Sequence, residues 1–138
     1  MSDAYCGGCA CGAIRYEVTD EPIAQIDCQC RSCQHLSGTG HSSYLIFPDH
    51  KQVKLEGEGK VWQVAGDNGN VKSHAFCTTC GSPVYLTSSA APGVFTIHAA
   101  SLDDPSRYAP QAVTYNVSGY AWDQVDPALH KFERMPPR

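Results

Sequence analysis

The amino-acid sequence predicts an all-β domain with little helix. Short segments of alternating or β-branched residues recur along the chain, and turn signals separate them. In the first of these segments Ile14, Tyr16 and Val18 are spaced two residues apart, so they share one face of a strand. At 138 residues the chain suits a single domain over positions 1–138, and its 42% of hydrophobic residues can fill a core.

Nine segments have the strand pattern and one has a helical pattern. The expected strands are residues 13–18, 23–28, 43–47, 52–56, 61–65, 71–76, 83–87, 95–99 and 112–115. Residues 30–37 are expected to hold one or two helical turns. Asp67-Asn68-Gly69-Asn70 contains the Asn-Gly pair typical of a tight hairpin turn, and breaks are expected at 91–93 and 103–105.

The aromatic residues of the middle and last parts of the chain are expected to be buried. Trp62 lies inside a strand pattern. Tyr120, Trp122, Leu129 and Phe132 follow the last expected strand, and we expect them to pack as a tail across the sheet.

Charge and hydropathy exclude two classes of partner. The formal net charge is −4, and the ten Lys and Arg residues are scattered without a basic stripe, which argues against nucleic acid. No segment approaches the roughly 18 apolar residues that cross a bilayer, and the first residues lack the pattern of a signal peptide. We therefore expect a cytoplasmic protein that binds neither nucleic acid nor membranes.

Eight cysteines in a reducing cytoplasm favour metal binding or catalysis over disulfides. They fall into three groups along the chain: Cys6, Cys9 and Cys11; Cys28, Cys30 and Cys33; and Cys77 and Cys80.

The outer groups predict two zinc knuckles. Cys9-Ala-Cys11-Gly12 and Cys77-Thr-Thr-Cys80-Gly81 each end in a glycine, which tolerates the turn that points backbone N–H groups at sulfur. Four thiolates complete a tetrahedral structural zinc site that would clamp the first strand to the middle of the sheet. Cys6-x-x-Cys9 offers an alternative first knuckle.

The middle group predicts a second metal site. Cys28, Cys30 and Cys33 place three sulfurs within six residues. Three protein ligands with one open position is the arrangement of a catalytic zinc, whose vacancy takes water or substrate. The alternative is a second structural zinc that Cys6 or a histidine completes.

Three tracts together resemble one family. They are Gly7-Gly8-Cys9-Ala10-Cys11-Gly12-Ala13-Ile14-Arg15-Tyr16-Glu17, then Cys28-Gln29-Cys30-Arg31-Ser32-Cys33, then Phe76-Cys77-Thr78-Thr79-Cys80-Gly81-Ser82-Pro83. Their order resembles the glutathione-dependent formaldehyde-activating enzyme family, and the resemblance covers nearly the whole chain. It implies an all-β, Mss4-like, zinc-stabilised fold. By motif match Cys9, Cys11, Cys77 and Cys80 hold a structural zinc, while Cys28, Cys30 and Cys33 hold a more labile, catalytic one.

The resemblance also implies an activity, the condensation of formaldehyde with glutathione, which is carbon–sulfur lyase chemistry on S-(hydroxymethyl)glutathione. The partner would be a small thiol such as glutathione. Gln29 replaces a histidine that is frequent in the family, and Gln34-His35 replaces a frequent basic pair. Arg31 is then the only cation in the central motif. The alternative is a non-catalytic, zinc-stabilised binding module, or a carrier of thiols or zinc, with the same fold.

No general base is evident from the sequence. His35, His41, His74 and His98 are each expected to be exposed, or buried with hydrogen bonds. His35 is the nearest of them to the central motif and is therefore the first candidate.

Overall fold

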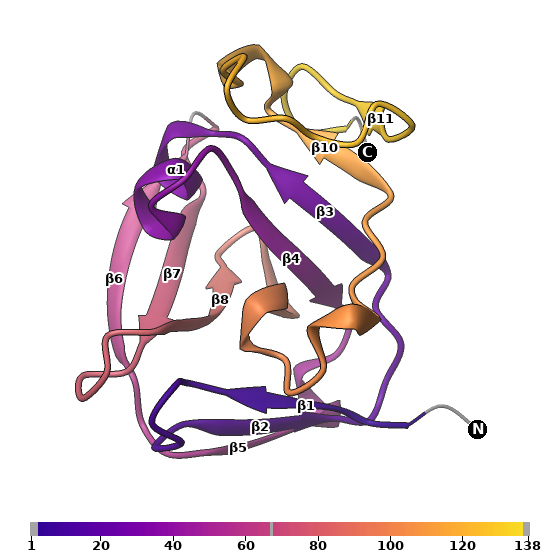
Figure 1. Cartoon of the computed structure of the whole chain (residues 1–138). Helices are drawn as coiled ribbons and strands as arrows, with labels where there is room; N and C mark the ends of the chain where they lie inside the picture. The colour runs from indigo at the N-terminus through magenta and orange to yellow at the C-terminus, as the bar shows by residue number, and fades with distance from the viewer. Residues whose placement is uncertain (1–2, 67, 137–138) are drawn as a thin grey trace.

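The computed structural model describes residues 3–66 and 68–136, and within them strands dominate (Figure 1). In chain order the elements are β1 (Tyr5–Gly8), β2 (Arg15–Val18), β3 (Ala24–Cys28), α1 (Arg31–Ser37), β4 (Ser42–Phe47), β5 (Val53–Glu56), β6 (Lys60–Ala65), β7 (Val71–Phe76), β8 (Pro83–Ser88), β9 (Ala91–His98), β10 (Ala112–Thr114) and β11 (His130–Lys131). Short 3-10 turns connect several of them. The expected all-β class is confirmed.

All nine predicted strands and the helix are present, and two strands were missed. Strand β1 was missed because glycines do not favour strands. Glycine is needed at Gly7 because the chain passes close by, and a Cβ there would lie 2.2 Å from the Ser101 carbonyl oxygen. Strand β11 has only two residues and depends on pairing with β10. The expected break at 91–93 is wrong, since β9 begins at Ala91.

The hairpin turn after β6 agrees with expectation where it is described. Asp67 lies outside the described residues. Gly69 has a φ of 82°, in the left-handed region that glycine favours. Gly66 and Asn70 close the turn with an N–H to carbonyl hydrogen bond of 2.8 Å.

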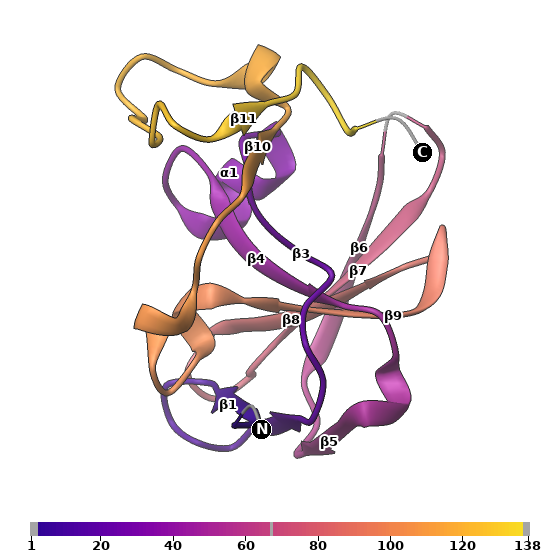
Figure 2. The same ribbon diagram turned by 90° about the vertical axis from the view of Figure 1, so that its right-hand side faces the viewer.

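The strands form two sheets. A three-stranded antiparallel sheet has the order β1-β2-β5, and an eight-stranded sheet has the order β11-β10-β3-β4-β9-β8-β7-β6. In the larger sheet β10 is parallel to β3 and to β11, while the other pairs are antiparallel. Figure 2 shows β1 and β5 at one end of the molecule and α1, β10 and β11 at the other, with β8 and β9 between.

The two faces of the large sheet have different roles. Leu45 of β4 and Ile97 of β9 are directly paired and pack with the small sheet in the main hydrophobic core. Tyr44 and Leu86 point to the opposite face, where a second cluster contains Cys28 and Cys33. Because side chains alternate along a strand, neighbouring residues serve the core and the sulfur-bearing face in turn.

Helix α1 has a cap at each of its ends. The sulfur of Cys30 accepts a hydrogen bond from the N–H of Cys33 at the first turn. Gly38 ends the helix in the left-handed conformation, with a φ of 75°, and donates its N–H to the carbonyl of Gln34. Among the described residues, no helix combines the length and the apolar character needed to span a membrane.

The expected burial of several aromatic residues is wrong. Trp62 is 36% exposed and lies on β6, which is the edge strand of the large sheet among the described residues. Tyr120 and Trp122 are 48% and 64% exposed and stack on each other, with ring centroids 5.8 Å apart, instead of packing on the sheet. Leu129 and Phe132 are half-buried.

A pair of matched substitutions tests the core. Ile97 is 0% exposed, and Ile97→Ala should lower the free energy of unfolding by about 2–5 kcal/mol, since the truncation leaves a cavity. Ile23 is 62% exposed, and Ile23→Ala should change that free energy by less than about 0.5 kcal/mol. Chemical denaturation measures both. Equal losses would contradict the assignment of Ile97 to the core.

Candidate metal centres

Four cysteine sulfurs meet between two turns that are distant in sequence. Cys9 and Cys11 come from the β1–β2 turn, and Cys77 and Cys80 come from the β7–β8 turn. The four sulfurs lie within 4.8 Å of one another. The Cys9–Cys11 and Cys11–Cys77 sulfur separations are 3.7 and 3.6 Å. Four sulfurs about 2.3 Å from one central ion would be separated by roughly 3.8 Å, so this group could hold a tetrahedral metal ion.

Backbone groups around these sulfurs favour their charged form. The N–H of Ile14 donates to the sulfur of Cys9 at 3.2 Å, and this bond is the main reason that the pKa of Cys9 is lowered. Hydrogen bonds from Ser82 lower the pKa of Cys80 to about 5. Because the thiolate is the form that binds metal, these bonds prepare Cys9 and Cys80 for a cation. At Cys11 the backbone hydrogen bond of Ala13 is outweighed by the neighbouring sulfurs, chiefly that of Cys77, which raise its pKa to about 11.

Three further sulfurs converge at the start of α1. Cys28 ends β3, Cys30 caps α1 and Cys33 lies in its first turn, and their sulfurs also lie within 4.8 Å of one another. Cys28 and Cys33 are buried, while Cys30 is partly exposed. Cys6, in β1, belongs to neither group, and all eight cysteines are free.

These three sulfurs cannot all ionise without a cation. Hydrogen bonds from Cys28 and Cys33 lower the pKa of Cys30, and Lys72 contributes a smaller lowering through its charge. The pKa of Cys28 is raised mainly by Cys30, and that of Cys33 mainly by Cys28. One negative charge is therefore favoured among three sulfurs, and a metal cation would relieve the repulsion of the other two.

A pocket of about 230 Å³ opens beside the three sulfurs. The residues that matter for binding are two cysteines, three cations and one histidine: Cys30, Cys33, Arg31, Lys72, Arg134 and His74. The sequence placed only Arg31 near the motif. Lys72 reaches the pocket from β7. Arg134 comes from the tail, which is held there by a hydrogen bond from the Tyr115 N–H to the Arg134 carbonyl. Two cations from distant parts of the sequence therefore join Arg31 at the pocket.

The two departures from the family pattern stabilise the motif loop. The Gln29 side chain donates to Asp123 and accepts from Asn116, both at 3.0 Å. Gln34 donates to the backbone carbonyls of Gln29 and Ser118, at 2.8 and 3.0 Å. Both glutamines are buried, so they tie the loop to the chain that follows β10.

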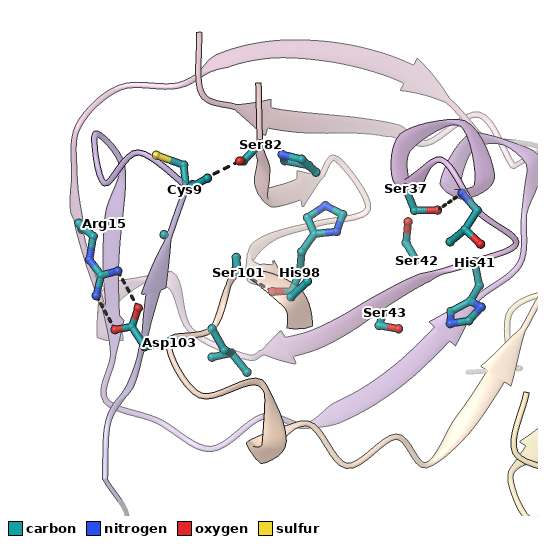
Figure 3. Close-up of a pocket in the computed structure, with 16 residues that line it drawn as sticks. Cys9, Arg15, Ser37, His41, Ser42, Ser43, Ser82, His98, Ser101 and Asp103 are labelled. Atoms are coloured by element: carbon teal, nitrogen blue, oxygen red, sulfur yellow. Dashed lines mark hydrogen bonds and ion pairs between the residues drawn. The ribbon is translucent and has the colours of Figure 1, made fainter. Parts of the chain in front are cut away.

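A larger cavity, of about 670 Å³, lies elsewhere (Figure 3). Figure 3 shows Cys9 near one end, His41 near the other and the ring of His98 between them. At its edge Arg15 forms two hydrogen bonds of 2.8 and 2.6 Å with the Asp103 carboxylate. The lining residues include no sulfur of the three-cysteine group, so the smaller pocket is the better candidate for chemistry at that group.

The four histidines singled out from the sequence fall into two classes. His35 is exposed, and His41 pairs with Asp123 at 2.9 Å, as expected. His74 and His98 are buried, but both ring nitrogens of His74 and Nε2 of His98 lack a hydrogen-bond partner, so the expectation of satisfied core histidines is wrong for them. Burial lowers the pKa of each to about 4, so both rings are neutral at pH 7.

The charge state of the buried histidines can be measured directly. The ring resonances of His74 and His98 should keep the chemical shifts of neutral imidazole down to about pH 5, because their pKa values are near 4. An unstructured histidine peptide, with a pKa of about 6.5, is the control. Nuclear magnetic resonance titration that shows either ring charged at pH 6 would contradict the burial described above.

Comparisons with known proteins agree with the geometry. The family model described as glutathione-dependent formaldehyde-activating enzyme matches residues 4–118. A crystal structure of a Rhodobacter sphaeroides protein is similar, with a TM-score of 0.60 and 21% identity over 79% of this chain and 99% of that chain. At this identity the structural likeness supports the fold alone. Because the family match spans most of the sequence and includes both cysteine groups, the chain belongs to the glutathione-dependent formaldehyde-activating enzyme family.

Proposed function

We propose that the protein is a zinc-dependent carbon–sulfur lyase that acts on a thiol–aldehyde adduct such as S-(hydroxymethyl)glutathione. Cys28, Cys30 and Cys33 would hold the active-site zinc. The structural zinc would be held by Cys9, Cys11, Cys77 and Cys80. The observation that carries the proposal is the opening of the three-sulfur group into a pocket that is also lined by three cationic side chains.

The charges of the pocket suit an anionic thiol. Glutathione has two carboxylates and one ammonium group, so a site for it needs cations or N–H donors. Arg31, Lys72 and Arg134 supply cations from three separate parts of the chain. At about 230 Å³ the pocket is smaller than the roughly 300–1,000 Å³ of typical ligand sites, so it fits the thiol end and leaves the rest of the molecule near the surface.

The sulfur donors fit zinc, and the surrounding residues fit the reaction. Zinc in the three-cysteine group would lower the pKa of a thiol in its fourth coordination position and hold it as a thiolate. The Tyr44 hydroxyl lies 3.0 Å from the Cys33 sulfur, and burial raises its pKa, so it stays protonated and can donate to that sulfur. Tyr44 therefore orients the buried side of the group, while the partly exposed Cys30 faces the pocket.

The bond changes balance without a redox partner. In condensation the thiol sulfur forms a bond to the aldehyde carbon, and the carbonyl π electrons move onto oxygen. The proton that the thiol loses ends on that oxygen. The reverse reaction breaks the carbon–sulfur bond and releases the thiol and the aldehyde.

Metal content distinguishes the two cysteine groups. The wild-type protein should contain about two zinc ions per chain, and Cys30→Ser should be folded with about one. Cys80→Ser should be insoluble or unfolded, because structural zinc contributes on the order of 10 kcal/mol, as much as the total stability of a typical domain. Cys6→Ser is the control and should keep both ions. A folded Cys80→Ser protein without zinc would exclude the structural role.

The proposed reaction can be tested by exchange between ¹³C-formaldehyde and its thiol adduct. The zinc-loaded protein should accelerate this exchange above the uncatalysed rate, and mild chelation should abolish the acceleration. Lys72→Gln should raise the half-saturating glutathione concentration about tenfold, the loss expected for one charge-assisted hydrogen bond. The same variant should leave the response to uncharged 2-mercaptoethanol unchanged.

Lys54→Gln is the matched control for this experiment, since the Lys54 side chain is 75% exposed on β5. It should behave as the wild type with both thiols. Thiol binding without any acceleration of exchange would identify a carrier and reject the lyase. Equal exchange by the zinc-loaded and the chelated protein would remove the metal from the mechanism.

A further inference from the structure

Unpartnered buried polar atoms gather on one face of the large sheet. Among the described residues, the buried side-chain nitrogens and oxygens without a hydrogen-bond partner belong to His74, His98 and Thr114. Strand pairing places them all on the face that carries Cys28 and Tyr44. Such atoms cost about 1–3 kcal/mol each when nothing binds them, and folded proteins retain few of them. Unpartnered polar atoms on the face that carries the three-sulfur group point to a ligand bound at this face.

His74 is the one of these residues that lines the small pocket. It is 2% exposed, and the ring of Trp62 stacks on it with centroids 4.7 Å apart and planes 25° apart. It lines that pocket with Cys30 and Cys33, yet its nitrogens are not part of the ligand group formed by the three sulfurs. The ring therefore lies beside the proposed metal position, where a molecule bound to the open coordination position would extend.

We propose that His74 is a catalytic residue whose ring N–H binds the oxygen of the aldehyde, or of the hydroxymethyl group of the adduct. This inference rests on the proposed lyase function. As the sulfur–carbon bond forms, negative charge develops on the carbonyl oxygen, and a donor already in place stabilises it. The proton lost by the thiol then ends on that oxygen, so His74 is unchanged at the end of the reaction.

The environment keeps His74 in the form that this role requires. A neutral imidazole has one N–H donor and one acceptor nitrogen. Burial, which disfavours the charged ring, keeps it neutral at pH 7. Trp62 covers one side of the ring and fixes its plane, so the donor is held in place before the substrate arrives.

The other histidines near the motif are less suited to this role. His35 is exposed on α1 and lies 3.4 Å from a guanidinium nitrogen of Arg31. His41 is engaged by Asp123, and His98 lines the larger cavity and packs on Tyr44, with ring centroids 5.0 Å apart. Only His74 combines burial, free ring nitrogens and a place in the small pocket among the described residues.

The test uses the full-length zinc-loaded protein and the ¹³C exchange measurement. His74→Phe keeps an aromatic ring against Trp62 but removes both nitrogens. It should retain about two zinc ions and the wild-type affinity for glutathione, while the maximal acceleration falls about 100-fold, as when one oxyanion donor is lost. His74→Gln, which restores an N–H donor, should recover part of the rate. His35→Phe is the matched control and should match the wild type.

Each outcome decides between the two proposals. A wild-type protein that accelerates exchange while His74→Phe does so equally well overturns this inference and leaves the lyase function standing. Loss of zinc or of glutathione affinity in both His74 variants makes His74 a structural residue and also overturns it. A wild-type protein without acceleration overturns the lyase function and this inference together.

Discussion

Both the main hydrophobic core and the sulfur-bearing face depend on one constraint, the alternation of side chains along the central strands. Tyr44 and Leu45 are sequence neighbours, as are Ile97 and His98, yet Leu45 and Ile97 lie in the main core while Tyr44 and His98 lie on the sulfur-bearing face. A slip of one residue in strand register would exchange these two sets. Core packing against the small sheet therefore also fixes the residues that surround the three sulfurs.

The two cysteine groups differ in how far they reach along the chain. The Cys11 and Cys77 sulfurs lie 3.6 Å apart although 66 positions separate the residues, whereas Cys28 and Cys33 lie close in sequence, at the end of β3 and in the first turn of α1. Closing a long loop removes more entropy from the unfolded chain than closing a short one. An ion in the four-sulfur group would thus act on the whole fold, while an ion in the three-sulfur group would act mainly on its own surroundings.

Sequence patterns were sufficient for features that depend on local spacing. Nine of the eleven described strands, α1 and both cysteine groups follow from periodicity, turn residues and Cys spacing, so they could be predicted, whereas the glycine-rich β1 and the two-residue β11 could not. Burial of Trp62 could not, because it depends on β6 being an edge strand. The pocket also contains Lys72, His74 and Arg134. Strand pairing and the path of the tail bring them there, and no sequence motif reveals strand pairing or the path of the tail. His74 could be named as a candidate from the sequence, but its burial without hydrogen bonds and its place in the pocket depend on the pairing of β7.

The segment that follows the family match has a consequence for how such a protein can diversify. The match ends at residue 118, but Asp123 and Arg134 lie beyond it, the first bound to Gln29 of the motif loop and the second lining the pocket. The sulfurs and the rim of the pocket are thus encoded in separable stretches of sequence. Substitutions in the tail can therefore change the rim of the pocket without altering a single sulfur of either cysteine group.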